Sequence, residues 1–431
     1  MILTLRKRAL AVGAAIALSL SVVAVAGAAS SDECTPPTDP SSISQQSAYQ
    51  KCRLDRIDAA LDGLTKPAVT VTETKTVTAP PPATTSAPPT TTSPPATTST
   101  TASPTSTATP TSTPTTTAPA GECVGAANTP GGPDPWGGCW PGPQNTGYPK
   151  GLPGDTRAKV TLTPYTGTTT IRSCGVVIDS KTIDRDILIE AGTADVKDLT
   201  KPCVTIRNSL VKGVIFSERQ TWGPLLIEDT EVVPDGLSWW ENIGRSNFTA
   251  IRVNSHGSQG VIKCDVNCVA KDSWVHGMEV GKSYHYNAFG GNGTNNFRIE
   301  HNYGTCGDWS ATEPGLTGDA GCSAVIGFYG DYAPNQNITI HRNYLASTFD
   351  MSAAGKDRQA GYCLNPGYYP GKPYPDTKNI AVTDNVFARG GSGKCGVFGP
   401  SNSLNKAGAP NGNTWSGNEY SDGVGIARVE E

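Results

Sequence analysis

The chain of 431 residues has few charged side chains, and they are not segregated by sign. Charged residues make up 17% of the sequence, with 34 basic and 38 acidic side chains and a net charge of −4 at pH 7. There is no basic stripe that could neutralise a phosphate backbone, so we expect no nucleic-acid partner. No apolar run after residue 30 has the length of a bilayer crossing, so we expect no membrane span once an N-terminal leader is removed.

Local signatures of several kinds of site are also missing. The sequence has no Gly-x-Ser-x-Gly nucleophile elbow, no phosphate-binding loop and no dinucleotide fingerprint. It has no Cys-x-x-Cys pair and no His–Cys cluster with zinc spacing, so we expect no bound metal.

The first thirty residues differ from the rest of the chain. A basic triplet, Arg6 to Arg8, precedes an apolar run from Ala9 to Ala26, and small residues follow. This order predicts a secretory signal peptide over residues 1–30, and therefore a secreted or extracellular protein, with tethering at the cell surface as one form. The apolar run is near the length of a membrane span, so an uncleaved anchor is the alternative.

Composition divides the remaining chain into four segments. Residues 31–66 carry aliphatic side chains at helical spacing, which predicts one short helical element. Residues 67–120 consist mainly of Thr, Pro, Ser and Ala and cannot bury a core, which predicts a disordered linker. Residues 121–150 form a Gly/Pro-rich lead-in, and residues 151–431 form a globular domain of short strands.

The twelve cysteines are an even set downstream of an export signal, where an oxidising compartment lets disulfides persist. We expect most of them to be paired, and the simplest partners are neighbours in the sequence. The cysteines are Cys34, Cys52, Cys123, Cys139, Cys174, Cys203, Cys264, Cys268, Cys306, Cys322, Cys363 and Cys395.

One short plan recurs along the globular domain: alternating apolar residues, a polar residue, an Asn or Asp, and another short strand. The residues taken as equivalent are Asn208, Asp229, Val253, Asp272, Asn302, Asn343 and Asn385. The first three steps are 21, 24 and 19 residues, and a period of roughly 20 to 24 predicts a parallel β-helix of roughly ten coils, in which each strand stacks on its equivalent. The two longest steps are either two coils or one coil carrying a large loop. Asn suits the bend because its amide can bond the next coil and because it tolerates left-handed backbone.

The strand after each bend is expected to stack into one parallel sheet whose outward face lines a groove. These strands begin at Lys212, Gln259, Tyr284, Cys322, Ala360 and Gly393. Leucine-rich repeats share the period, but they need Leu at fixed positions that this chain does not have.

The chain resembles the pectate-lyase-like proteins, and more closely a group of secreted actinobacterial β-helix proteins. The resemblance covers about Gly151 to Gly423 and rests on five stretches: "GLPGDTRAKVTLTPYTG" at Gly151, "DSWVHG" at Asp272, "HYNAFGG" followed by "IEHN" from His285, "YCLNPG" at Tyr362 and "TDNVFARGGSGKCGVFGP" at Thr383. It implies an all-β fold, a right-handed parallel β-helix built as a single-stranded solenoid. In related proteins a His-x-Asp pair on this strand faces the substrate groove; here His285 matches, and Asn287 replaces the Asp.

These features predict that the groove binds an extended polysaccharide or a cell-wall glycan. The more specific hypothesis is cleavage by β-elimination. This reaction needs a base to take a proton and a positive charge to neutralise the sugar carboxylate. The candidate catalytic residues are His285 and Lys263 as bases and Asn287 to orient the sugar. The candidate substrate contacts are Arg298, Tyr284, Tyr286 and Tyr362. Calcium is possible in such a lyase, but no acidic cluster supports it, so we expect no cofactor.

Two alternatives stay open. Glycoside hydrolysis needs two carboxyl groups flanking one bond, and no Asp or Glu pair falls on equivalent groove positions, so it ranks below lyase chemistry. A non-catalytic cell-surface adhesin or a phage virion fibre component could use the same solenoid. The spacing of His256 and His276 predicts that these histidines stack on successive coils, as turn residues or as a paired site. The sequence does not predict an oligomeric state.

Overall fold

The computed structural model describes residues 123–431 apart from five internal gaps, which are 237–240, 259–261, 279–284, 307–320 and 348–359. These residues belong to the second of two compact units, Thr115–Glu431. The predicted signal peptide, N-terminal helix and linker lie outside the described residues, as do Cys34, Cys52 and Tyr284. Within the described part, no helix has the length and apolar character to cross a bilayer.

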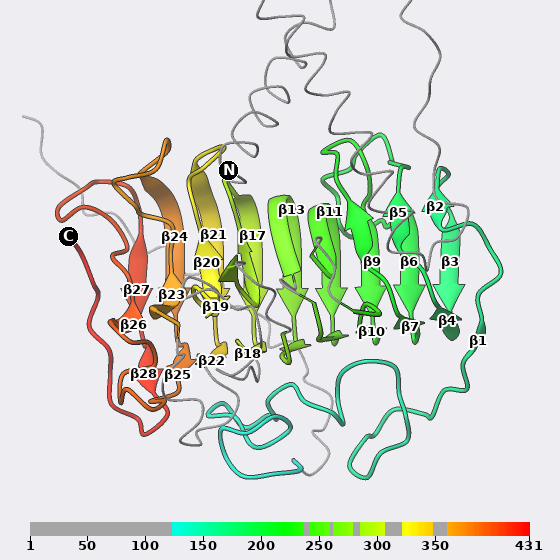
Figure 1. Ribbon diagram of the computed structural model, residues 1–431, viewed down its shortest axis with the longest axis horizontal. Coiled ribbons are helices and arrows are strands. Elements are labelled where there is room, and N and C mark those ends of the chain that lie inside the picture. Colours follow the sequence, from blue (N-terminus) through cyan, green and yellow to red (C-terminus); the bar gives the residue numbers. More distant parts are fainter. Residues whose placement is uncertain (1–122, 237–240, 259–261, 279–284, 307–320, 348–359) are drawn as a thin grey trace, which may run out of the picture. The chain divides into compact units, whose positions relative to one another are not determined.

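The described chain is all-β and consists of parallel strands in three columns, each strand paired with its equivalent one turn of the chain away (Figure 1). The first column contains β2 (Thr170–Ile171), β5 (Ile187–Ile189), β8 (Ile215–Ser217), β11 (Ile243–Ile251), β13 (Ile262–Lys271), β16 (Phe289–Gly291), β20 (Ile326–Phe328), β23 (Tyr362–Asn365) and β26 (Gly399–Ser401). These pairings are compatible with a β-helix solenoid.

The second column shares the long strands β11 and β13 with the first, which joins both columns into one sheet. Its other members are β3 (Val176–Asp179), β6 (Val204–Arg207), β9 (Leu225–Glu228), β17 (Asn295–Glu300), β21 (Asn335–His341), β24 (Thr377–Thr383) and β27 (Thr414–Ser416). The pairing register shifts between Arg245 and Ser246, where β11 passes from one column to the other.

The third column is a separate sheet of ten strands, one from each successive turn of the chain. Its strands are β1 (Thr163–Pro164), β4 (Lys181–Ile183), β7 (Leu210–Val211), β10 (Glu231–Val232), β12 (Asn254–Ser255), β14 (Trp274–Val275), β18 (Tyr303–Thr305), β22 (Tyr344–Ala346), β25 (Val386–Phe387) and β28 (Glu419–Tyr420). A small additional pair joins β15 (His285–Tyr286) to β19 (Gly321–Cys322).

The core lies between the columns because alternate residues of each strand point inward. In the second column Ile206, Ile227, Ala250 and Ala270 stack in register, and each is fully buried. Full burial of an Ile side chain contributes roughly 1.5–3 kcal/mol, so the inward stacks of side chains contribute much of the stability of the fold.

Strand pairing also decides between the two interpretations of the longest repeat steps. Tyr303 of β18 pairs directly with Tyr344 of β22, and Tyr344 pairs directly with Val386 of β25. Each long step is therefore one coil carrying a large loop.

The prediction that the seven bend residues occupy one equivalent position is wrong. Three of them lie one position before the other four. Strand pairing aligns Asn208 and Asp229 with Arg252, and it aligns Asp272 with His301. Asn302, Asn343 and Asn385 occupy the following position, where Val253 also lies. The prediction merged two neighbouring positions because Asn occurs at both.

All ten cysteines of the described part form disulfides between sequence neighbours, as predicted. The pairs are Cys123–Cys139, Cys174–Cys203, Cys264–Cys268, Cys306–Cys322 and Cys363–Cys395. Such pairs persist in oxidising compartments, which weakly indicates an extracellular setting.

Candidate functional site

The candidate site is the outer face of the first column, from β8 to β26. The inward residues of successive strands, such as Ile215, Ile243 and Ile262, stack in register and are at most 1% exposed. Because side chains alternate along a strand, the residues beside them point outward. These outward positions are Phe216, Gly244, Lys263, Gly290, Gly327 and Asn365. Most of the predicted groove strands therefore do stack in one parallel column.

A charged cluster occupies the N-terminal part of this face. The ammonium of Lys263 lies 2.8 Å from Glu241 Oε1, and Arg245 Nε lies 3.5 Å from Glu241 Oε2. Arg245 also approaches Asp265 at 3.9 Å, and its guanidinium carbon lies 5.5 Å from the centre of the Phe216 ring. One guanidinium therefore stands between two carboxyl groups.

The two carboxyl groups differ in electrostatics. Burial opposes ionisation of Glu241, but the charges of Lys263 and Arg245 outweigh burial and lower its pKa to about 2. Burial raises the pKa of Asp265, and the cations Arg245 and Lys263 offset this only in part. Paired carboxyl groups with divergent pKa values are typical of acid–base sites. Here, however, the carboxylate of Glu241 is already engaged with two cations.

Two more glycines, Gly290 and Gly327, follow Gly244 and Lys263 along the same face. A Cβ atom added at Gly290 would collide with the carbonyl oxygen of Gly327, and one added at Gly327 would collide with the amide of Asn287. Both glycines are buried, and the neighbouring backbone and the Asn287 side chain fill the space that a Cβ atom would need.

A cluster of amides and hydroxyls borders these glycines. Asn287 Nδ2 donates to the carbonyl oxygen of Ala324 at 2.8 Å. The Tyr329 hydroxyl is hydrogen-bonded to Asn287, Ser323 and Asn365, which come from three successive coils. Burial raises the pKa of Tyr329, and these hydrogen bonds offset part of that rise.

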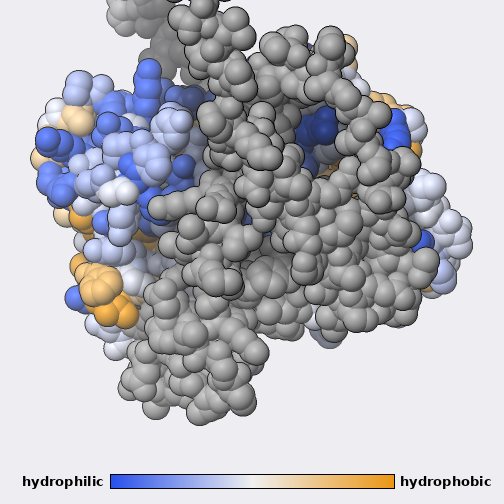
Figure 2. Space-filling view, turned by 45° about the horizontal axis from the view of Figure 1, so that its top comes forward, coloured by the Kyte–Doolittle hydropathy of each residue, from blue (hydrophilic) through white to orange (hydrophobic). Residues whose placement is uncertain are grey.

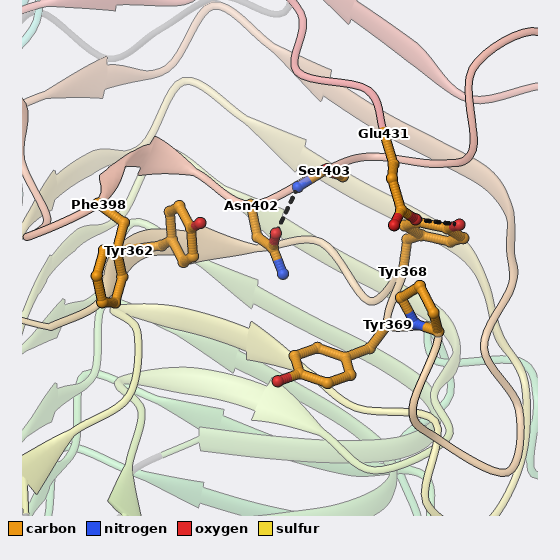
Figure 3. A pocket seen from close by; sticks show the side chains of 8 residues that line it. Tyr362, Tyr368, Tyr369, Phe398, Asn402, Ser403 and Glu431 are labelled. Carbon is orange, nitrogen blue, oxygen red and sulfur yellow. Dashed lines mark hydrogen bonds between the residues drawn. The ribbon is translucent and has the colours of Figure 1, made fainter.

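An aromatic pocket of about 450 Å³ ends the face at its C-terminal side (Figure 3). It is lined by Tyr362, Tyr368, Tyr369, Pro370, Phe398, Asn402, Ser403 and Glu431. The rings of Tyr362 and Phe398 lie 5.7 Å apart, and Phe398 is 68% exposed. A hydrogen bond of 2.6 Å to Glu431 raises the pKa of the Tyr368 hydroxyl to about 12.

Exposed aromatic rings beside amide and hydroxyl groups suit a ligand with both apolar and hydrogen-bonding faces. Elsewhere, where described residues reach the surface in Figure 2, they are mainly hydrophilic, with small hydrophobic patches between them.

The structure brings three of the predicted site residues onto the outer face of the first column. Lys263 belongs to the charged cluster, Asn287 to the amide–hydroxyl cluster and Tyr362 to the aromatic pocket. They do not form one compact centre. The side-chain amide of Asn287 donates to a backbone carbonyl, and its side chain is hydrogen-bonded to Tyr329. Asn287 therefore stabilises the local structure.

The remaining predicted residues lie elsewhere. Tyr286 is 1% exposed and packs in the core, so its predicted contact with a sugar is wrong. Arg298 lies in the second column and pairs with Glu300 at 2.7 Å. The backbone of His285 pairs with Gly321 in the small sheet, and its side chain is outside the described part, as is the whole of Tyr284.

Sequence reasoning missed Glu241, Arg245, Tyr329 and Phe398. The coil "NIGR" at Asn242 was not identified as a groove strand, although Ile243 pairs with Ile215 and Ile262. Alternation in phase with Ile243 would assign Glu241 and Arg245 to the core face, since Arg245 pairs with the buried Cys264, so their place beside Lys263 comes from the tertiary structure.

The predicted stacking of His256 on His276 is confirmed, with ring centres 5.0 Å apart and planes 18° apart. His256 Nε2 lies 3.0 Å from Glu231, and His276 Nε2 lies 2.9 Å from Asn254 Oδ1. These rings follow strands of the third column and are not part of the candidate site. Over the described residues no group of three or more His, Cys, Asp or Glu side chains is arranged to hold a metal ion.

No protein-family model, curated protein or solved structure matches this chain, so the geometry of the outer face is the evidence for its function.

Proposed function

We propose that this is a secreted protein that binds an extended polysaccharide or cell-wall glycan along the outer face of the first column. One observation carries this proposal. The charged cluster, the amide–hydroxyl cluster and the aromatic pocket all lie on the same face of one strand column, across successive coils. Neighbouring strands are about 4.8 Å apart, so the column offers regularly spaced contacts to a polymer.

The scaffold we infer is a right-handed parallel β-helix of the pectate-lyase-like kind. The three columns of parallel strands support it, since connections between parallel strands are right-handed in nearly all proteins. Secretion is supported by the N-terminal leader pattern and by the five disulfides.

The proposed activity is binding without cleavage, as in an adhesin or a fibre component. Lys263 would have to release its proton to act as the base of a β-elimination, and the buried carboxylate of Glu241 would then lose its closest cation. Leaving a buried charge without its partner is costly, which disfavours this role.

The test is affinity electrophoresis of the full chain through gels containing a panel of neutral and acidic polysaccharides. Phe398→Ala and Tyr362→Ala should each weaken binding about tenfold, which corresponds to about 1.4 kcal/mol. Arg298→Ala, which changes an exposed residue of the second column, is the control and should bind like the wild type. No retardation by any polymer, or equal retardation of all variants, would overturn the proposal. Reducing-end and unsaturated-product assays on the same samples would detect cleavage, and cleavage would replace the binding-only assignment.

A further inference from the structure

The charges on the outer face carry information about the class of ligand. Resting on the proposed function, we infer that the polysaccharide bound there is uncharged, and that the face discriminates against polyuronates. The evidence comes from the balance of carboxylates and cations along the face.

The four residues of the charged cluster balance in charge, and Glu218, a further acid that acts on Arg245, makes the carboxyl groups outnumber the cations. Glu218, Glu241 and Asp265 all act electrostatically on Arg245, and Lys263 is the second cation. The cluster therefore has a formal charge of −1, from three acids and two bases. A sugar carboxylate approaching this surface would meet an excess of its own sign.

The two cations are also committed to protein carboxylates. Lys263 is paired with Glu241, whose side chain is only 10% exposed. A uronate that drew Lys263 away would leave the charge of Glu241 buried without its closest partner. The cost of an uncompensated buried charge exceeds what an exposed ion pair with the ligand returns.

Asp265 shares its cation with Glu241. Arg245 lies 3.9 Å from Asp265 and 3.5 Å from Glu241, so one guanidinium already serves two carboxyl groups. A carboxylate from a ligand would have to compete with both for the same cation.

The aromatic pocket also lacks a positive charge among its lining residues, which are aromatic, amide, hydroxyl and proline groups together with Glu431. Beside the pocket, the ammonium of Lys372 lies 5.9 Å from the centre of the Tyr369 ring and is paired with Asp331 at 2.9 Å. Carboxylates and amides accept hydrogen bonds from sugar hydroxyls, so this composition suits a polyhydroxylated, uncharged polymer.

The decisive experiment compares polymers that differ only in charge. Full-length protein would be tested against polygalacturonate, alginate and a glucuronan, each beside its carboxyl-reduced form, together with a neutral β-glucan and a neutral xylan. We expect binding to at least one neutral polymer and at least tenfold weaker binding to the acidic member of the same pair. Equal or tighter binding to an acidic member would overturn the inference while leaving polysaccharide binding intact. Absence of binding to every polymer would instead overturn the proposed function.

A charge variant tests the cause. Glu218 is exposed, so Glu218→Gln removes one negative charge without disturbing the core. It should raise the ratio of acidic to neutral affinity about twofold to fivefold at low ionic strength, and the rise should disappear in high salt. The matched control is Glu419→Gln in the third column, which should not change the ratio. An unchanged ratio in Glu218→Gln would show that charge on this face does not select the ligand.

Discussion

Each bend that follows a strand of the second column contains two neighbouring residues with different structural roles. The first has left-handed backbone, with φ of +46° at Asp229, +50° at Arg252 and +51° at His301. This conformation costs a non-glycine residue roughly 1–2 kcal/mol. Stacked neighbours offset the cost by pairing: Arg252 Nε donates to Asp229 Oδ1 at 2.8 Å, and His301 Nδ1 lies 2.6 Å from Asp272 Oδ1.

The second bend residue forms a buried ladder. Asn302 Nδ2 donates to Asn343 Oδ1 at 2.9 Å, Asn343 Nδ2 donates to Asn385 Oδ1 at 3.0 Å, and Asn385 Nδ2 donates to Asn418 Oδ1 at 2.9 Å. Each amide also bonds backbone groups, so the ladder satisfies polar atoms that have no access to water.

Asn343→Ala should therefore lower the free energy of unfolding by about 2 kcal/mol, because the backbone N–H and the amide of Asn302 both lose their acceptor. Asn343→Ser should cost less. Ser273 already fills the equivalent position, where its hydroxyl accepts from the backbone N–H of Val253 at 3.1 Å. Urea unfolding of both variants gives the comparison, and equal losses would contradict the ladder's role.

Lys263→Met tests the buried ion pair of the charged cluster. Removing the ammonium leaves Glu241 with a more distant cation, so we expect a loss of about 2–3 kcal/mol. The folded-state pKa of Glu241, about 2, lies below its ordinary 4.5, so the pair stabilises the fold above pH 4.5 and is lost as pH falls toward 2. The variant's stability should depend less on pH in that window. Lys201→Met, at an exposed pair with Asp198, is the control and should leave stability nearly unchanged, because water screens an exposed pair.

At the scale of elements, the lead-in segment packs against the third column through aromatic side chains. The Trp140 ring is fully buried and lies 5.4 Å from the Tyr344 ring and 5.7 Å from the His301 ring. In Figure 1 the segment is the cyan trace running beside the strands of this column. The composition of residues 121–150 predicts a Gly/Pro-rich connection. The structure shows that this segment covers one face of the third column.

His301 links the lead-in to the bend after β13, because it lies 3.1 Å from Asp134 and 2.6 Å from Asp272. Burial opposes its protonation, but the two carboxylates outweigh burial and raise its pKa to about 9. The ordinary pKa is 6.5, so this contribution is complete below pH 6.5 and is lost as pH rises through about 9.

We therefore expect the free energy of unfolding to fall by up to about 3 kcal/mol between pH 6.5 and pH 9.5, measured by urea unfolding at each pH. Asp134→Asn should reduce stability at pH 6.5 and flatten the dependence. A wild-type profile that does not fall across this range would contradict the ionic role of His301.

At the scale of the whole described unit, the disulfides close loops of very different lengths. Cys174–Cys203 closes a loop with a sequence separation of 29, whereas Cys264–Cys268 spans a separation of 4 inside β13. Loop-closure entropy favours the longer link, since an unfolded chain loses more freedom when distant residues are joined.

Replacing both cysteines of the longer pair by alanine should cost about 4 kcal/mol, against about 2 kcal/mol for the shorter pair. Thermal or urea unfolding of the two double variants measures the difference. A larger loss for the Cys264–Cys268 variant would mean that this link acts by holding the turn of β13 between two columns, not through chain entropy.

The sequence by itself determined the parallel strand repeat, the position of the bends to within one residue and the neighbour pairing of the described cysteines. These follow from local patterns: alternating apolar residues, Asn and Asp at turns, and short cysteine spacings. Only the tertiary structure decided which side chains share the outer face. A strand residue faces the core or solvent according to its register, and Tyr286 turned inward while Lys263 turned outward beside Glu241. Glu241 and Lys263 are 22 residues apart and meet only because successive coils stack, a contact that no local pattern encodes.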